Sequence, residues 1–280
     1  MIIVALALLG LFMGSFVNAL VWRIHEQSVE KGRSKVNKKY VEKLSITKGR
    51  SMCPNCKHQL SPSDLVPVLS WITLKGQCRY CHNPISPQYP LIELFVALLF
   101  TGSYLWWPLS LTGALNTLVF IVWLMLVVGL IALLVYDIRW YLLPNRLMYP
   151  LAAIASAELI LKWFSFGLNS GTIINEILAV VVGGGIFYFI FQISGGKWIG
   201  GGDVKLGYLL GLIAGTPSRS LLFIFLAALI GTFISLPLIA SHRLQRNSVI
   251  PFGPFLIVSL IIVQLFGVNI LHWYQHLILS

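Results

Sequence analysis

Two aspartates stand at the edges of long apolar stretches, where a carboxylate is costly. Asp137 closes the run Ile-Ala-Leu-Leu-Val-Tyr-Asp, and Asp203 follows three glycines at 200–202. A carboxylate at the centre of a bilayer costs about 2.5–3.5 kcal/mol or more, so acids there need an explanation. The glycines allow a backbone or a substrate strand to approach closely. Two carboxylates facing one site can divide the roles of acid and base in peptide hydrolysis.

A structural explanation competes with this one. Asp137 can form an ion pair with Arg146, and Asp203 with Lys205 or Lys197, as charged residues at membrane edges commonly do. The spacing alone leaves both interpretations open.

Three other acids lie in or beside apolar stretches. Glu158 can pair with Lys162 one helical turn later. Glu93 and Glu176 fall in the first turns of their predicted helices, where the helix dipole favours an anion. We expect structural roles for all three, with Glu93 a minor functional candidate.

The four cysteines form two C-x2-C pairs separated by 21 residues, Cys53 with Cys56 and Cys78 with Cys81. Two such knuckles can deliver four thiolates to one tetrahedral Zn²⁺. A redox-active cysteine pair is the functional alternative. The orientation derived below places these cysteines in the cytosol, where disulfides are rare, and this favours metal binding. Four thiolates leave no open coordination position, so the pattern predicts a structural zinc site.

The elements that must position these residues are membrane helices. Of the 280 residues, 57% are apolar and 10% are charged, against about 25% charged in an ordinary soluble domain, which excludes a typical soluble enzyme. Runs of about 20 apolar residues suffice to cross a bilayer. The apolar runs predict an all-α polytopic membrane protein with about eight spans, the sixth one short, at 1–22, 91–107, 115–136, 147–164, 172–194, 204–217, 220–240 and 253–276.

The distribution of charge predicts the orientation. Of the 20 Lys and Arg, 18 fall in alternate loops at 23–90, 137–146, 195–205 and 241–252. Cytosolic loops carry such an excess, so we expect the amino terminus outside and the cysteine loop in the cytosol. The net charge of +11 then follows from topology, and no nucleic-acid partner is expected.

Five motifs, in order along the chain, resemble those of bacterial type IV prepilin peptidases of the bifunctional leader peptidase/N-methyltransferase type, which belong to the GxGD aspartic proteases. The motifs are Gly14-Ser15-Phe16-Val17-Asn18 with Arg23, the cysteine-rich stretch from Cys53 to Phe100, Asp137 through Leu143-Pro144-Asn145, Gly200-x-Gly202-Asp203-x-Lys205, and Pro251-Phe252-Gly253-Pro254-Phe255.

The resemblance implies an enzyme of the bacterial cytoplasmic (inner) membrane with Asp137 and Asp203 as its catalytic pair. It would cut the basic leader of pilin-like or pseudopilin precursors after a Gly at the cytosolic membrane edge. It would then methylate the new amino terminus with S-adenosylmethionine. The sequence shows no Gly-rich motif for that methyl donor, so its binding residues stay unknown. Gln77 stands where the family often has a basic residue.

The expected organisation is a first transmembrane helix at 1–22, a cytosolic zinc-binding loop at 23–90 and a membrane-embedded protease domain at 91–280. Two other classes of protein stay open. A membrane transporter could use the intramembrane aspartates for ion coupling, and a membrane-anchored zinc module would leave them unused. A zinc metalloprotease is disfavoured, because the H-E-x-x-H pattern is absent from the sequence.

Overall fold

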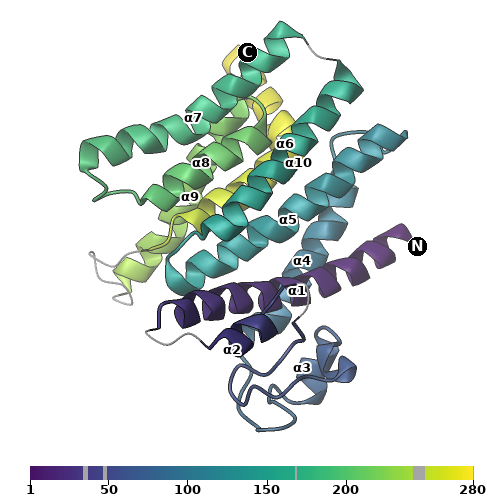
Figure 1. Cartoon of the computed structure of the whole chain (residues 1–280). Helices are drawn as coiled ribbons and strands as arrows, with labels where there is room; N and C mark the ends of the chain where they lie inside the picture. Colours follow the sequence, from purple (N-terminus) through teal and green to yellow (C-terminus); the bar gives the residue numbers. More distant parts are fainter. Residues whose placement is uncertain (34–36, 47–48, 168, 242–249, 280) are drawn as a thin grey trace. The chain divides into compact units, whose positions relative to one another are not determined.

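The computed structural model describes residues 1–33, 37–46, 49–167, 169–241 and 250–279. Within these ranges the regular structure is helical, apart from two isolated β-bridges (Figure 1). The predicted all-α fold is therefore confirmed. The chain divides into two compact units, Met1–Leu105 and Trp106–Ser280. Of the loop predicted at 241–252, residues 242–249 lie outside the described ranges.

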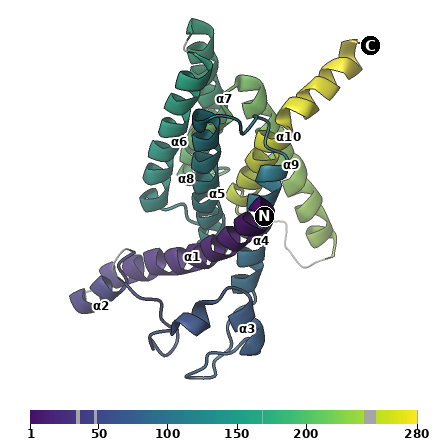
Figure 2. The same cartoon turned by 90° about the vertical axis from the view of Figure 1, so that its right-hand side faces the viewer.

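Unit 1 is built on two long helices, α1 (Ile2–Lys31) and α4 (Gln88–Leu105), which pack against each other. Glycines allow this close approach. A Cβ on Gly14 would lie 2.5 Å from Cα of Glu93, and one on Gly10 would lie 2.5 Å from Cα of Ala97. Small residues one turn apart bring two membrane helices into backbone contact in this way. The short elements α2 (Lys38–Lys43), η1 (Pro62–Leu65) and α3 (Leu69–Thr73) lie between them in sequence (Figure 2).

Polar side chains of α1 hold the segments that follow it. Asn18 Nδ2 donates to the carbonyl oxygen of Tyr89 at 3.1 Å. Arg23 donates to the carbonyl oxygen of Ser45 at 3.1 Å, and Gln27 to that of Leu44 at 2.7 Å. The bonds to Leu44 and Ser45 fix the start of the loop to the polar end of α1, and the bond to Tyr89 joins α1 to the first turn of α4.

Unit 2 contains six helices: α5 (Ala114–Trp140), α6 (Asn145–Phe166), α7 (Ser170–Ser194), α8 (Gly201–Ala214), α9 (Pro217–Ala240) and α10 (Gly253–Leu279). The local sequence sets several boundaries. Tyr141 ends α5 in the left-handed conformation, and Pro144 precedes the first turn of α6. Thr216 caps α9 and Pro217 occupies its first position, as expected for a helix start.

Helices α7 and α8 approach each other through glycines on both. A Cβ on Gly211 would lie 2.6 Å from the carbonyl oxygen of Ala179, and one on Gly207 would lie 2.5 Å from that of Gly183. The ring of Tyr208 covers Gly184. Any larger side chain would separate the helices, so this contact fixes where α8, and with it Asp203, sits along α7.

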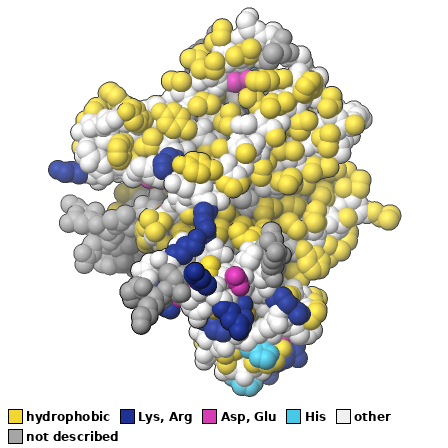
Figure 3. Space-filling model, in the orientation of Figure 1, with side chains coloured by type: hydrophobic (Ala, Val, Ile, Leu, Met, Phe, Trp, Pro, Cys, Tyr) yellow, Lys and Arg dark blue, Asp and Glu magenta, His cyan; other side chains and the backbone are white. Residues whose placement is uncertain are grey.

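Seven helices in the described ranges are long and apolar enough to cross a membrane: α1, α4, α5, α6, α7, α9 and α10. Together with the relatives described below, they make this an integral membrane protein. In Figure 3 many hydrophobic side chains lie on the visible surface of unit 2, and several Lys and Arg side chains lie over the loop that follows α1 in unit 1. The sixth span predicted at 204–217 is α8, whose 14 residues extend only about 21 Å.

Candidate active site and metal centre

Asp137 lies in the last turn of α5 and is 5% exposed. The N–H of Gly253, the first residue of α10, donates a hydrogen bond to its carboxylate. The fit is close, since a Cβ on Gly253 would lie 2.5 Å from Oδ2 of Asp137. Only glycine therefore leaves the carboxylate in this position.

Asp203 lies in the first turn of α8, and the N–H of Gly200 donates to its carboxylate. A helix start favours a negative charge, because its free N–H groups and dipole point toward it. The glycines at 200–202 form the end of the loop and the start of this turn, so Asp203 is held by the backbone that precedes it.

The fold brings the two aspartates together, although 66 positions separate them in sequence. Their carboxylates lie within range of direct electrostatic interaction. The elements explain why: α8 packs on α6 and α10, and α10 packs on α5. The end of α5 and the start of α8 therefore meet beside the start of α10. Asp137 is buried and Asp203 is half-buried, and two like charges close together in such a site favour one shared proton.

The two motifs that contain the aspartates also contact each other. Leu143 packs beside Gly202, where an added Cβ would lie 3.4 Å from Leu143 Cδ1. Lys205 Nζ donates to Oδ1 of Asn145 at 3.2 Å. Sequence reasoning offered Lys205 as an ion-pair partner of Asp203, and in the structure its ammonium group binds the first turn of α6 instead. The sequence motifs contain Leu143, Asn145 and Gly253 but give no sign of their roles, because their contacts with Gly202, Lys205 and Asp137 depend on how distant helices pack.

The remaining acids have structural partners. The predicted pair of Glu158 and Lys162 is confirmed, with Oε1 and Nζ 2.8 Å apart. Glu176 accepts the indole N–H of Trp163 at 2.9 and 3.0 Å. In unit 1, Glu93 accepts the backbone N–H of Val68 at 2.7 Å and a hydrogen bond from Ser15.

The four cysteines of unit 1 converge on one point. The sulfur atoms of Cys53, Cys56, Cys78 and Cys81 all lie within 4.8 Å of one another, and those of Cys53 and Cys81 are 3.9 Å apart. Four sulfurs at about 2.3 Å from a tetrahedral Zn²⁺ stand about 3.8 Å from each other. The arrangement fits a zinc site with four cysteine ligands.

The two knuckles have the same backbone structure, 25 positions apart. Cys53 N–H donates to the carbonyl of His58, and Cys78 N–H to that of Asn83, each at 2.9 Å. Lys57 and His82 occupy the matching left-handed positions, with φ of 58° and 56°. Burial opposes ionisation of both first cysteines, and two backbone N–H groups oppose burial at each of them. Burial prevails at Cys53, whose pKa is raised to about 12, whereas the N–H groups together with hydrogen bonds from Cys53 and Cys81 lower the pKa of Cys78 to about 7. Such N–H groups stabilise the thiolate that a metal requires.

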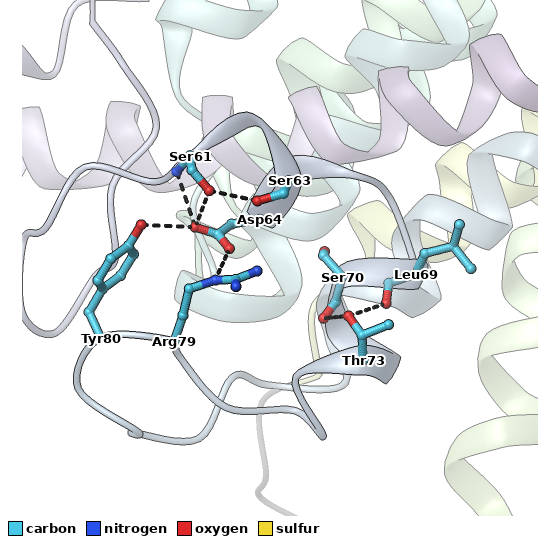
Figure 4. Close-up of polar contacts among 8 residues, drawn as sticks. All are labelled: Ser61, Ser63, Asp64, Leu69, Ser70, Thr73, Arg79 and Tyr80. Carbon is cyan, nitrogen blue, oxygen red and sulfur yellow. Dashed lines mark hydrogen bonds and ion pairs between the residues drawn. The ribbon is translucent and has the colours of Figure 1, made fainter.

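An acidic side chain ties the second knuckle to η1 (Figure 4). Asp64 accepts the Nε–H of Arg79 at 2.7 Å and the hydroxyl hydrogens of Ser61 and Tyr80 at 2.8 and 3.3 Å. Burial alone would raise the pKa of Asp64, but the hydrogen bonds from Ser61 and Arg79 outweigh it and hold this pKa below its usual value. The carboxylate thus bridges the residues between Cys78 and Cys81 to the rest of the loop.

Two families match consecutive parts of the chain. Residues 8–107 match the Bacterial Peptidase A24 N-terminal domain, and residues 124–236 match the Type IV leader peptidase family. The first match contains the four cysteines. The second contains both aspartates.

Relatives match nearly the full length. The chain is 32% identical to the prepilin leader peptidase/N-methyltransferase of Bacillus subtilis (strain 168), over 82% of this chain and 87% of the relative. It is 30% identical to the protein of the same name from Aeromonas hydrophila, over 95% of this chain and 91% of the relative. It is 27% identical to the protein of that name from Pseudomonas aeruginosa, again over 95% of this chain and 91% of the relative. No solved structure matches the chain. The resemblance drawn from the five motifs is thereby confirmed: the chain belongs to the prepilin leader peptidase/N-methyltransferase family, within the Peptidase A24 group of aspartic proteases.

Proposed function

We propose that the enzyme removes the leader from type IV pilin-like or pseudopilin precursors, with Asp137 and Asp203 as its catalytic pair. The observation that carries the proposal is the meeting of two carboxylates from separate motifs, one held by Gly253 and the other by Gly200. The names of the relatives, prepilin leader peptidases, support the substrate class.

In this mechanism one aspartate is ionised and the other is protonated. The ionised carboxylate takes a proton from water as the water oxygen bonds to the carbonyl carbon of the leader Gly. The protonated carboxyl group gives its proton to the carbonyl oxygen. When the C–N bond breaks, the departing amine takes the proton that came from water. A hydroxyl of the intermediate returns the other proton, and the pair regains its starting state.

Gly200, Gly202 and Lys205 support the pair without touching the reacting atoms. Gly200 donates its N–H to Asp203, and Gly202 leaves room for Leu143. Lys205 joins the starts of α8 and α6 through Asn145. These contacts keep the positions of the two aspartates fixed relative to each other during the reaction.

The test is cleavage of a purified pilin-like precursor by Asp137→Asn and Asp203→Asn variants. Each should lose several orders of magnitude in kcat/KM, because neither acid nor base can be replaced by an amide. Asp64→Asn is the matched control, since it makes the same chemical change in unit 1, and it should cleave within a few-fold of the parent. Near-normal cleavage by either folded dyad variant contradicts the mechanism.

The cysteine cluster is proposed to hold one structural Zn²⁺ through Cys53, Cys56, Cys78 and Cys81. When bound, the metal supplies crosslinking of the two knuckles, because four thiolates fill its coordination sphere. Zinc therefore has no step in leader cleavage.

The second proposed activity is methylation of the amino terminus that cleavage creates. S-adenosylmethionine would supply the methyl group, as the names of the N-methyltransferase relatives indicate. The acceptor amine must be neutral to react, and with a pKa of about 7.7–8.0 it is partly so near neutral pH. With labelled methyl donor, a competitive inhibitor of donor binding should stop labelling and leave cleavage unchanged. Cleaved product that is never labelled contradicts this second activity.

The proposed location is the bacterial cytoplasmic membrane, with the amino terminus outside and the cysteine loop in the cytosol. The 18 Lys and Arg in alternate loops support this orientation. Precursors of a type IV pilus or of type II secretion would present their basic leader on that side. The division into 1–22, 23–90 and 91–280 stays a prediction.

A further inference from the structure

Unit 2 contains a cavity at the end of the helices opposite to the aspartates. Its volume is about 340 Å³, and its walls come from the end of α6, the starts of α7 and α9, the end of α8, the segment 107–109 and α10. Asp203 stands in the first turn of α8, and Ala214, a wall residue, ends that helix. Eleven helical residues correspond to about 17 Å. The cavity is therefore separate from the proposed catalytic pair.

Arg219 is the first reason to expect a ligand. It lies in the first turn of α9, half-buried in the cavity wall, with its side chain beside Gly267 of α10. No ion pair or side-chain hydrogen bond joins its guanidinium to any residue that the structure describes. A guanidinium removed from water is costly unless an anion accepts its N–H groups.

Two buried polar atoms in the same walls also lack partners among the described residues. They are the indole Nε1 of Trp107, a donor, and Oε1 of Gln264, an acceptor on a side chain that is 4% exposed. Leaving such groups unsatisfied in a buried site is unfavourable, because they lose the hydrogen bonds that water would supply. The cavity thus offers one unused donor and one unused acceptor in addition to the charge of Arg219.

Of the four charged side chains in the cavity walls, two form an ion pair with each other and two have no partner of opposite charge among the described residues. Lys162 is neutralised by Glu158 at 2.8 Å. Glu176 receives only the neutral indole N–H of Trp163, and no cation pairs with it among the described residues. One full positive charge, on Arg219, and one full negative charge, on Glu176, therefore remain. A ligand with a charge of each sign matches this pattern better than a simple anion does.

From these groups we propose that the cavity binds a phospholipid headgroup that carries both a phosphate and a primary ammonium, of the phosphatidylethanolamine class. The phosphate accepts from Arg219 and from Trp107 Nε1. The ammonium donates to Glu176 and to Oε1 of Gln264. The walls also contain Leu159, Leu212 and Val268, which suit the start of the acyl chains. Four of the helices around the cavity, α6, α7, α9 and α10, are long and apolar enough to cross a membrane. These features favour a lipid over a soluble zwitterion.

The test measures lipid binding to the purified full-length protein by native mass spectrometry, with three lipids of identical acyl chains. Phosphatidylethanolamine should bind with one molecule per chain, at least about tenfold more tightly than phosphatidylcholine, whose trimethylammonium has no N–H, or phosphatidylglycerol, which has no cation. Equal binding of all three overturns the proposal. Displacement of the lipid by millimolar O-phosphoethanolamine would instead assign the site to a soluble ligand and overturn the lipid assignment.

Variants identify the site. Arg219→Gln and Gln264→Leu should each lose the preference for phosphatidylethanolamine. Lys197→Gln, an equal loss of charge at an exposed position of the same unit, should keep it. A preference that survives both cavity changes places the lipid elsewhere and contradicts the assignment. The comparison of the three lipids on the parent protein does not depend on how the variants fold. Because no readout involves cleavage, the result is independent of the proposed peptidase function.

Discussion

The N–H of Gly253, at the start of α10, donates a hydrogen bond to the carboxylate of Asp137, at the end of α5. The contact joins two helices that are far apart in sequence. It also makes a backbone group, rather than a side chain, the support for one member of the proposed catalytic pair. A side chain at 253 cannot take over this role, since it would occupy the space of the carboxylate.

Gly253→Ala should therefore impair leader cleavage while the fold persists. The added Cβ would lie 2.5 Å from Oδ2 of Asp137 and must push the carboxylate aside. A displacement of about 1 Å can cost about 100-fold in rate, so we expect a loss in kcat of roughly 10- to 100-fold. Gly185→Ala, a change in α7 where the Cβ meets only Val181 at 3.8 Å, should cleave normally. Full activity of Gly253→Ala would show that the carboxylate tolerates displacement.

The glycine contact between α7 and α8 predicts a difference in stability between two identical substitutions. Gly211→Ala places a Cβ 2.6 Å from the carbonyl oxygen of Ala179, whereas Gly185→Ala makes only an ordinary van der Waals contact with Val181 at 3.8 Å. Both gain similar helix propensity, about 1 kcal/mol, and overpacking costs about 1–3 kcal/mol.

Thermal unfolding in detergent should then place the Tm of Gly211→Ala several degrees below that of Gly185→Ala. Equal Tm values would mean that the helices separate without cost, and the glycines would not fix the position of α8.

The cysteine cluster predicts one zinc per chain. Cys53→Ser or Cys78→Ser should lose it, as measured by elemental analysis of protein prepared without chelators. His82→Asn should retain it, because His82 is outside the cluster and Asn tolerates its φ of 56°. Thiolates bind the metal and protons compete for them, so zinc should be released as the pH falls. Zinc-free protein with full loop structure contradicts the assignment.

Asp64 predicts how the loop responds to acid. Its folded pKa is lowered by Ser61 and Arg79 against the effect of burial. Its contribution to stability is therefore complete above the unfolded pKa of about 3.9 and is lost as the pH falls through the folded value.

Asp64→Asn should remove this contribution at neutral pH and speed the transfer of zinc to a chelator by several-fold, because the second knuckle loses its charged contact with Arg79. Chelator competition followed by absorbance measures the rate. An unchanged rate would show that the knuckles hold the metal without η1.

The parts of the molecule that sequence could predict are those set by local pattern. Apolar runs located the membrane helices, and matched C-x2-C spacing located the cysteine cluster. The pairing of Glu158 with Lys162 follows from helical spacing alone. The contacts of Gly253 with Asp137 and of Lys205 with Asn145 could not be predicted, because they depend on how distant helices pack. The expected ion pair of Lys205 with Asp203 is replaced by a hydrogen bond to Asn145. Residues two positions apart at a helix start can point to different partners, so closeness in sequence did not predict this contact.

The length of α8 has a consequence for the lipid around the enzyme. This helix extends about 21 Å along α7, whose 25 residues extend about 37 Å, while the hydrocarbon layer of a bilayer is about 30 Å thick. Where α8 meets the bilayer, the difference of about 9 Å can be met by local thinning of the bilayer or by entry of the loops at 195–200 and 215–216 into it. In both cases water reaches depths that a full-length span would keep dry. The proposed hydrolysis of a precursor at the membrane edge would use that water, so the rate of leader cleavage should depend on acyl-chain length.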